Sequence, residues 1–224
     1  MAMGNAELFT ISPGYVSCLS CLNACVLIDL DYGFQGKITL VVHTHSADII
    51  ATLIELKREV EHHTKARIKL TIAGGGEAHL LAKELGQAKV GVILNPVRPF
   101  PAAWASRRIL AGPPLTEDSQ IVQLLKHKVT VGVGVSESWE AQNGRLDLGW
   151  VAVEAGGRIP KEQALMLGTV NMVKLLGCKE DGLEVGAESV WEDELVATAG
   201  GDLLEFGSKI VAVASLRRGF VDVF

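Results

Sequence analysis

The chain has 224 residues, a formal net charge of −5 at pH 7 and an apolar fraction of 48%. This composition excludes a disordered chain, and the length predicts one large or two small domains with a core that needs no disulfide framework. The acidic balance, without any long lysine or arginine run, argues against a nucleic-acid partner or a membrane partner.

Residues 1–36 form an amino-terminal segment whose structure the sequence leaves open. The apolar stretch 15–30 is short for a membrane span and has no basic region before it, so we expect neither a span nor a signal peptide. The chain is therefore expected to be soluble, with the cytoplasm favoured. Cys18, Cys21 and Cys25 have no fourth ligand nearby, so we interpret them as buried thiols rather than as a metal or cluster site.

From residue 37 onward, strand and helix patterns alternate. A continuous apolar, β-branched run predicts a strand at residues 38–43 that is covered on both faces. Further strands are predicted within residues 66–76, 89–96 and 129–136, the last of them buried. Helical spacing predicts helices over residues 48–63, 77–86, 117–128, 148–157 and 159–177. We expect Ser46 or Asp48 to cap the first helix, Gly86 to end the second and Thr116 to cap the third.

A proline-rich loop and a carboxyl-terminal β-segment complete the chain. Residues 96–115 contain five prolines and cannot form regular structure, but Phe100, Trp104 and Ile109 need burial, so we expect an ordered loop over the domain. Short strands between turn residues predict antiparallel pairing within residues 179–224. The alternation over residues 37–178 predicts an α/β domain with a parallel sheet and right-handed crossovers.

Chemistry in parallel β/α folds is placed at the carboxyl ends of the strands. The residues at these four ends are His43 and His45; the glycines at 74–76 with Glu77; Asn95 with Arg98; and Ser136 with Glu137 and Trp139. We therefore expect these groups to converge on one rim of the sheet.

His43 and His45 are the candidate metal ligands. Their i, i+2 spacing places both imidazoles on one side of a strand, where they can hold a divalent metal that polarises a carbonyl or activates water. The alternative is one histidine packed beneath the sheet and one bonded to the following helix. We expect His79 at the surface or an interface, and His62 and His63 solvated in a charged loop.

The other rim residues are candidates for substrate binding and proton transfer. The glycines around Gly75 admit a ligand close to the backbone and the following helix amides could hold an anion, or they form a plain strand-to-helix turn. Ser136 and Glu137 could be a nucleophile or an acid–base pair, or a loop cap and an ion-paired carboxylate. Trp139 and Trp150 are expected in a pocket wall or in the core.

Several of these stretches together resemble the carboxyl-terminal half of amidohydrolase-superfamily proteins. The stretches are, in order, "VVHTHSADIIATL", "GGGEAHLLAKEL", "VGVILNP" and "VTVGVGVSESW". The later stretch "GGRIPKEQALMLGTVNMVKLLG" is similar to the family's final barrel helix, with its signature at Thr169, Asn171, Leu175, Leu176 and Gly177. The resemblance covers roughly residues 37–224. It implies a partial (β/α) barrel, about strands five to eight, with a small antiparallel β-segment.

The resemblance also implies a metal-dependent hydrolase that acts on the carbon–nitrogen bond of an amide or cyclic amide. It matches His43 to a metal histidine, and it matches Ser136, with Glu137 beside it, to the position of a catalytic aspartate. His45 is the second metal candidate, and zinc is the expected ion. The residues that would bind the small-molecule substrate are Gly75, Asn95, Arg98, Trp104 and Trp139.

Two departures from the family pattern support an alternative. Residues 1–36 lack the first-strand His-x-His motif, and the glycines at 74–76 occupy the place of the sixth-strand histidine. The alternative is a catalytically degenerate or truncated relative that binds a small molecule, a glycan or a protein. Four barrel strands would also expose two unpaired edges, so we expect a homo-oligomer, with a two-fold dimer of half barrels as the hypothesis.

Overall fold

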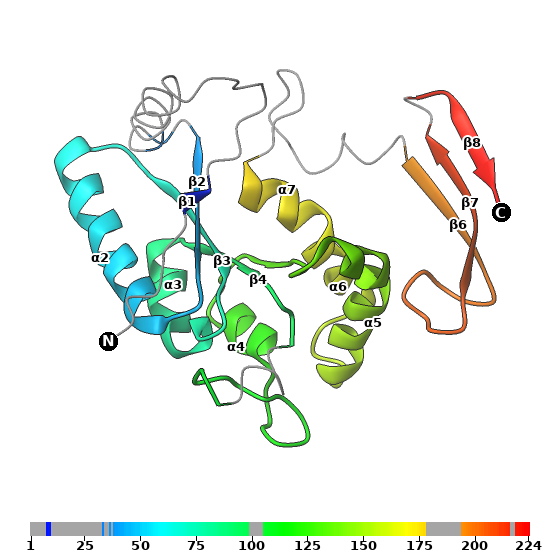
Figure 1. Ribbon diagram of the computed structural model, residues 1–224, viewed down its shortest axis with the longest axis horizontal. Helices are drawn as coiled ribbons and strands as arrows, with labels where there is room; N and C mark the ends of the chain where they lie inside the picture. The colour runs from blue at the N-terminus through cyan, green and yellow to red at the C-terminus, as the bar shows by residue number, and fades with distance from the viewer. Residues whose placement is uncertain are drawn as a thin grey trace.

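The computed structural model describes residues 8–9, 33, 36, 38–98, 105–177, 194–215 and 218–224. The structure is α/β, with a five-stranded sheet and a separate three-stranded sheet (Figure 1). The strands of the larger sheet follow the order β1 (Leu8–Phe9), β2 (Thr39–Thr44), β3 (Lys69–Gly74), β4 (Gly91–Leu94) and β5 (Val131–Val133). Strands β2 to β5 are parallel, as predicted, and β1 pairs antiparallel with β2.

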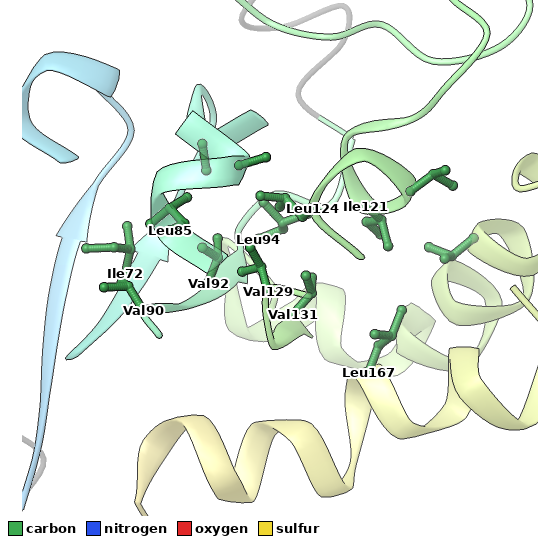
Figure 2. Packing of buried hydrophobic residues seen from close by; sticks show 14 of the residues in the cluster. Ile72, Leu85, Val90, Val92, Leu94, Ile121, Leu124, Val129, Val131 and Leu167 are labelled. Atoms are coloured by element: carbon green, nitrogen blue, oxygen red, sulfur yellow. The ribbon is translucent and has the colours of Figure 1, made fainter. Parts of the chain in front are cut away.

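Helices cover one face of the parallel sheet. They are α2 (Ala47–Thr64), the 3₁₀ helix η1 (Ala78–Leu81), α3 (Ala82–Ala88) and α4 (Gln120–Lys126). Apolar side chains from alternate strand positions, from these helices and from the helices after β5 form one buried cluster, which includes Ile72, Val92, Leu94, Leu85, Leu124 and Leu167 (Figure 2). Burial of each such side chain contributes about 1.5–3 kcal/mol. The strands are therefore held in position mainly from this face.

The opposite face of the sheet is contacted by α7 (Val170–Leu176). Thr71 Oγ1 donates a hydrogen bond to the carbonyl oxygen of Leu175 (2.8 Å), and Asn171 Nδ2 donates to the carbonyl oxygen of Val131 (2.7 Å). A Cβ at Gly91 would overlap the side chain of Leu175, so the missing side chain lets α7 lie against the strand. These contacts lie at or near the amino ends of the strands, away from the rim predicted to carry chemistry.

The single helix predicted over residues 159–177 is wrong, because the chain forms two helices there. α6 (Lys161–Gly168) is separated from α7 by Thr169, which has φ −122° and ψ −94°. Thr169 Oγ1 donates to the carbonyl oxygen of Leu165 at 2.9 Å, and a side chain bonded to the preceding turn disturbs helix continuation. The preceding helix is α5 (Gly144–Glu154), which starts before the predicted residue 148 and follows the 3₁₀ helix η2 (Ser138–Asn143).

The predicted end of the second helix at Gly86 is also wrong. Gly86 lies inside α3, and the helix is closed instead by Lys89 in the left-handed conformation, with φ 53°. A Cβ at Gly86 would overlap the carbonyl oxygen of His127. The glycine is therefore required by a close approach of two segments, which local helix-ending rules do not detect.

Thr116 does not cap the third helix. α4 begins at Gln120, and Thr116 lies in the preceding loop. Its Oγ1 accepts a hydrogen bond from the amide of Gly112 (2.9 Å) and donates to the carbonyl oxygen of Asp118 (2.9 Å). The hydroxyl therefore closes a turn, and the predicted start of the helix at residue 117 is three residues too early.

The three-stranded sheet is antiparallel, as predicted for the carboxyl-terminal segment. Its strands are β6 (Glu194–Ala199), β7 (Lys209–Ser215) and β8 (Phe220–Val223), in that order. The loop between β6 and β7 contacts α5 and α6. Arg145 Nη1 donates to Ser208 Oγ (2.8 Å), and Lys161 Nζ lies 3.0 Å from Glu205 Oε1. These contacts fix the loop beside the helices that follow β5.

Among the described residues, no helix is long and apolar enough to cross a membrane. Several predictions fall outside the described residues: the thiols at 18, 21 and 25, the side chains of Phe100 and Trp104, and residues 179–193 of the β-segment. The predicted loop over residues 96–115 is described at both ends, where it contains neither helix nor strand.

Candidate functional site

The carboxyl ends of β2 to β5 lie side by side along one edge of the sheet. The backbone bonds that join them continue past the strands: Gly75 N donates to Thr44 O (2.8 Å), and Asn95 N donates to Gly74 O (3.1 Å). Ser136 Oγ then donates to Asn95 Oδ1 at 2.6 Å. The structure therefore brings the ends of all four parallel strands to a common rim.

The histidine pair lies at the β2 end of this rim. The rings of His43 and His45 are 5.0 Å apart between centroids and nearly perpendicular, at 89°. His45 Nδ1 is buried and has no hydrogen-bond partner among the described residues. Burial, with the charge of Arg107 and then His43, lowers the pKa of His45 to about 4. His45 is therefore a neutral imidazole at pH 7, and its Nδ1 atom is buried without a described partner.

A network of hydrogen bonds forms around the carboxylate of Glu77, whose amide bonds to the carbonyl oxygen of His45. Glu77 Oε2 accepts from the amide of Ala47 (2.9 Å) and from Arg108 Nη2 (2.8 Å), and Glu77 Oε1 accepts from the amide of Arg108 (2.9 Å). Burial alone would raise the pKa of Glu77, but these hydrogen bonds outweigh it and lower the pKa to about 2. The carboxylate thus occupies the amino end of α2, where Ser46 makes no side-chain cap.

The sequence did not identify this network. The amides after Gly75, expected to hold an anion, are bonded within the chain: Glu77 N donates to His45 O and Ala78 N donates to Gly75 O, both at 3.0 Å. Arg108 lies 31 positions from Glu77, inside the proline-rich loop, and no local pattern links the two residues. The only sequence feature that could have indicated this network is a glutamate directly after a run of glycines.

Gly75 is buried, and its backbone polar groups are already used. Its amide donates to Thr44, and its carbonyl oxygen accepts from the amide of Ala78 (3.0 Å) and from Gln120 Nε2. A Cβ at neighbouring Gly74 would lie 2.9 Å from His45 Cε1. The glycines therefore make room for the imidazole of His45, and the groups open to a ligand on this rim lie nearer to Asn95 and Ser136.

Two predictions about the remaining histidines need correction. His79 was expected at the surface or an interface, but it is only 9% exposed, and its Nδ1 has no partner among the described residues. It is buried because η1 packs between α2 and α4. Burial lowers the pKa of His79. His62 and His63 are exposed as expected, but they lie in the last turn of α2 and not in a loop.

Ser136 and Glu137 lie at the exposed end of β5. The amides of both residues donate to Glu140 Oε2, at 2.8 and 3.1 Å, so Glu140 fixes the start of η2. The Ser136 hydroxyl donates to the amide oxygen of Asn95, which is not a base. This bond positions the hydroxyl without activating it as a nucleophile.

The two histidines fit part of a metal site. A structural or catalytic zinc takes about three or four protein ligands, and neutral imidazoles are suitable donors. In the described part of the chain, no group of three or more histidine, cysteine, aspartate or glutamate side chains could hold a metal ion. His43 and His45 supply two donors, so the described residues do not complete the metal site that the family resemblance implies.

A cavity of about 1060 Å³ lies next to the β4 and β5 end of the rim. Predicted substrate-binding residues Arg98 and Trp139 line it, together with Trp150 and Phe206. Arg98 Cζ lies 4.7 Å above the Trp150 ring, and Arg98 forms an ion pair with Asp147. The sequence did not indicate Phe206, because the loop between β6 and β7 reaches the cavity only through tertiary packing. Trp104 is outside the described residues.

This chain is similar in sequence or in fold to parts of two larger known proteins. No family model matches the chain. Over 169 residues, the chain is 36% identical to amidohydrolase tasK of Hapsidospora irregularis, an alignment that covers 68% of this chain and 17% of that protein. The crystal structure of an amidohydrolase from Thermotoga maritima superposes with a TM-score of 0.57 and 22% identity, covering 84% of this chain and 45% of that chain. The chain thus spans about a sixth of the curated relative and under half of the solved chain.

Proposed function

We propose that this chain, which is related to amidohydrolases over part of its length, is hydrolase-like and has its reacting centre on the rim of β2 to β5. The name shared by both matches supports hydrolysis in general. We propose the carbon–nitrogen bond of a small amide or cyclic amide as the bond that is cleaved. The structural neighbour supports the fold alone, and the parallel strands β2 to β5 would be about strands five to eight of a barrel-like fold.

The observation that carries this proposal is the histidine pair. A buried nitrogen without a hydrogen-bond partner costs free energy, and such atoms are rare in folded proteins. His45 Nδ1 is such an atom among the described residues, and it lies at a strand end beside a second imidazole. The proposal gives this costly arrangement a use, because an imidazole that stays neutral can coordinate a metal ion.

A divalent metal ion, with zinc as the first expectation, would use His43 and His45 as two of its ligands. The low pKa of His45 favours this, because protonation does not compete with metal binding near neutral pH. Any further ligand must come from outside the described residues, either from this chain or from another polypeptide.

The other rim residues have proposed roles that do not depend on the metal ion. Asn95 and Ser136, joined by their 2.6 Å hydrogen bond, would orient the substrate amide. Glu137 is exposed at the same strand end, where its carboxylate also accepts a hydrogen bond from the amide of Glu140. It would take a proton from the attacking water and pass it to the departing nitrogen. Arg98 and Trp139 would contact the remainder of the substrate from the adjacent cavity.

We also propose that the chain acts as a homo-oligomer. Strand β1 pairs with β2 at one edge of the sheet, while β5 at the other edge pairs with β4 and has no strand on its outer side among the described residues. An unpaired strand edge favours association, and a two-fold dimer would join two half barrels. Sedimentation or light scattering at micromolar concentration tests this, and a monomer mass would refute it.

A second candidate is a small-molecule binding module that has lost catalysis. The shortfall of metal ligands in the described part of the chain favours it. A binding module would keep the rim and the cavity without needing a complete metal site.

Zinc content and hydrolysis separate the two candidates. The purified chain would be dialysed against zinc, analysed for bound metal, and assayed with p-nitroacetanilide and dihydrouracil as an open-chain and a cyclic amide. We expect bound zinc and turnover, and we expect both to fall to background in the H43A/H45A double variant. The H62A/H63A variant is the matched control, because it removes an exposed pair of similar geometry, with centroids 5.6 Å apart. A chain without zinc or turnover refutes the hydrolase and supports the binding module.

A further inference from the structure

We infer that the cavity lined by Trp139, Trp150, Val153 and Phe206, here called the tryptophan cavity, binds an uncharged aromatic small molecule. The proposed reaction uses only Trp139 of these four side chains, and it does not explain why Trp150, Val153 and Phe206 are open to solvent. The exposed fractions are 64% for Trp139, 60% for Trp150, 81% for Val153 and 87% for Phe206. An apolar patch rimmed by polar residues marks a binding site more often than a free surface.

The walls of the tryptophan cavity come from separate parts of the chain. Trp139 belongs to η2, Trp150 and Val153 to α5, and Phe206 to the loop between β6 and β7. The loop is fixed beside α5 by the hydrogen bonds of Arg145 to Ser208. The concave shape is therefore held by contacts outside the apolar lining.

The charged side chains of the lining are already paired. Arg98 bonds to Asp147, and Lys161 bonds to Glu205 and to Asp202. Glu140 accepts two backbone amides at the start of η2. A charged ligand would have to displace one of these partners, whereas an uncharged ligand would not. The ligand is therefore expected to be neutral, and recognition would come from aromatic stacking and apolar burial.

The size of the cavity favours a small molecule over a protein partner. Its volume of about 1060 Å³ is close to the upper end of the roughly 300–1,000 Å³ typical of ligand pockets. A protein partner would more often occupy a flat surface of at least about 600–800 Å² per side. The remaining alternative, a second copy of this chain seated on the aromatic side chains, is an outcome of the test below.

The cavity opens beside the Asn95 and Ser136 pair. Pro96 and Val135, the chain neighbours of these two residues, both line it. If the proposed function holds, the cavity would receive the aromatic group of an amide whose carbonyl lies at the rim. That second role rests on the proposed function, whereas binding of an aromatic molecule does not.

A matched pair of fluorescent probes tests the inference. N-phenyl-1-naphthylamine is uncharged, and 8-anilino-1-naphthalenesulfonate is the same skeleton with one negative charge. We expect the uncharged probe to bind saturably, with one site per chain, about tenfold more tightly than the sulfonate. Trp150→Ala should weaken binding of the uncharged probe about tenfold. Val153→Asp changes an exposed position of the same wall. It should also weaken binding of the uncharged probe, and it should not disturb the core.

Phe224→Ala is the control, because Phe224 is 79% exposed and is absent from the cavity lining. The inference is refuted if the uncharged probe does not saturate, if Phe224→Ala weakens binding as much as Trp150→Ala, or if the wild-type chain is a dimer that Trp150→Ala converts to monomers. Probe binding without amide hydrolysis would refute the proposed function and leave this inference standing. Hydrolysis without probe binding would refute this inference and leave the proposed function standing.

Discussion

The two ends of the strand rim differ in the kind of group that they leave without a partner. At the β2 and β3 end, Glu77 accepts three hydrogen bonds, and the groups without a described partner are polar: the Nδ1 atoms of His45 and His79. At the β4 and β5 end, the charged side chains are paired, while the free surface is apolar and includes Trp139 and Trp150.

This difference separates metal binding from substrate recognition. A buried polar atom without a partner and an exposed aromatic ring both have an unfavourable free energy in the unliganded chain. The first can be relieved by a metal ion, and the second by an apolar group. The comparison supports metal binding at the β2 end, and substrate binding and proton transfer at the β5 end. The three substitutions and the titration below test the packing, charge and protonation on which this comparison depends.

The largest effect is expected for Glu77→Gln, which weakens the network behind the histidines. Glutamine cannot accept all of the bonds from Ala47 and Arg108 that the carboxylate accepts. We expect the free energy of unfolding to fall by about 1.5–3 kcal/mol at pH 7, measured by urea denaturation. The exposed α3 residue Glu84, changed to glutamine, is the control and should have little effect.

The same variant has a distinct pH dependence. The pKa of Glu77 in the folded chain, about 2, lies below its ordinary value of 4.5, so its stabilising contribution is present above pH 4.5 and is lost as the pH falls towards 2. The difference in stability between wild type and Glu77→Gln should therefore shrink between pH 5 and pH 2. A difference that stays constant over this range would contradict the proposed role of the carboxylate.

Gly86→Ala should have the next largest effect on the free energy of unfolding. We expect it to destabilise the chain, although helix propensity alone would predict stabilisation. Alanine normally stabilises a helix interior by about 1 kcal/mol relative to glycine. Here the added Cβ would overlap the carbonyl oxygen of His127, a backbone atom, so we expect a net loss of about 1–2 kcal/mol in the free energy of unfolding. Gly144→Ala, where a Cβ meets nothing within 4 Å, is the matched control and should be neutral or stabilising. Equal effects would show that α3 is not tightly packed.

Titration of His45 tests the β2 end directly. Because its pKa in the folded chain is about 4, the His45 nitrogen signals in NMR spectra should stay those of a neutral ring from pH 8 down to about pH 5. The unfolded imidazole protonates near 6.5, so this group's contribution to stability is full above pH 6.5 and decreases as the pH falls towards 4. Protonation near pH 6.5 in the folded chain would remove the argument for a neutral metal ligand.

Arg98→Met should have the smallest effect on stability, because its ion pair with Asp147 is partly exposed. We expect a change below about 1 kcal/mol in the free energy of unfolding. The variant leaves Asp147 without its partner, so a cationic aromatic probe should bind more tightly than to the wild type, while N-phenyl-1-naphthylamine should be little affected. Tighter binding of the sulfonated probe instead would show that the charges of the cavity are not balanced as described.

Particular residues show how far sequence reasoning could reach. The strand ends were predictable, because buried β-branched runs and the parallel order of the strands depend on short-range patterns, and this brought Asn95 and Ser136 to the same edge. Thr169 and Gly86 were misread because a back-bonding hydroxyl and a close approach to His127 override local helix rules. His79 was misread because its burial depends on the packing of η1 between two other helices.

The sequence by itself determined the α/β class, the parallel order of β2 to β5 and the position of the histidine pair at a strand end. Alternation of apolar runs is local, and the direction of each crossover follows from chain chirality. Tertiary structure alone decided that Glu77 bonds to Arg108, that His45 Nδ1 is buried without a described partner, and that Phe206 joins Trp150 in one cavity. These are contacts between segments distant in the chain, which form only when the packed layers bring them together.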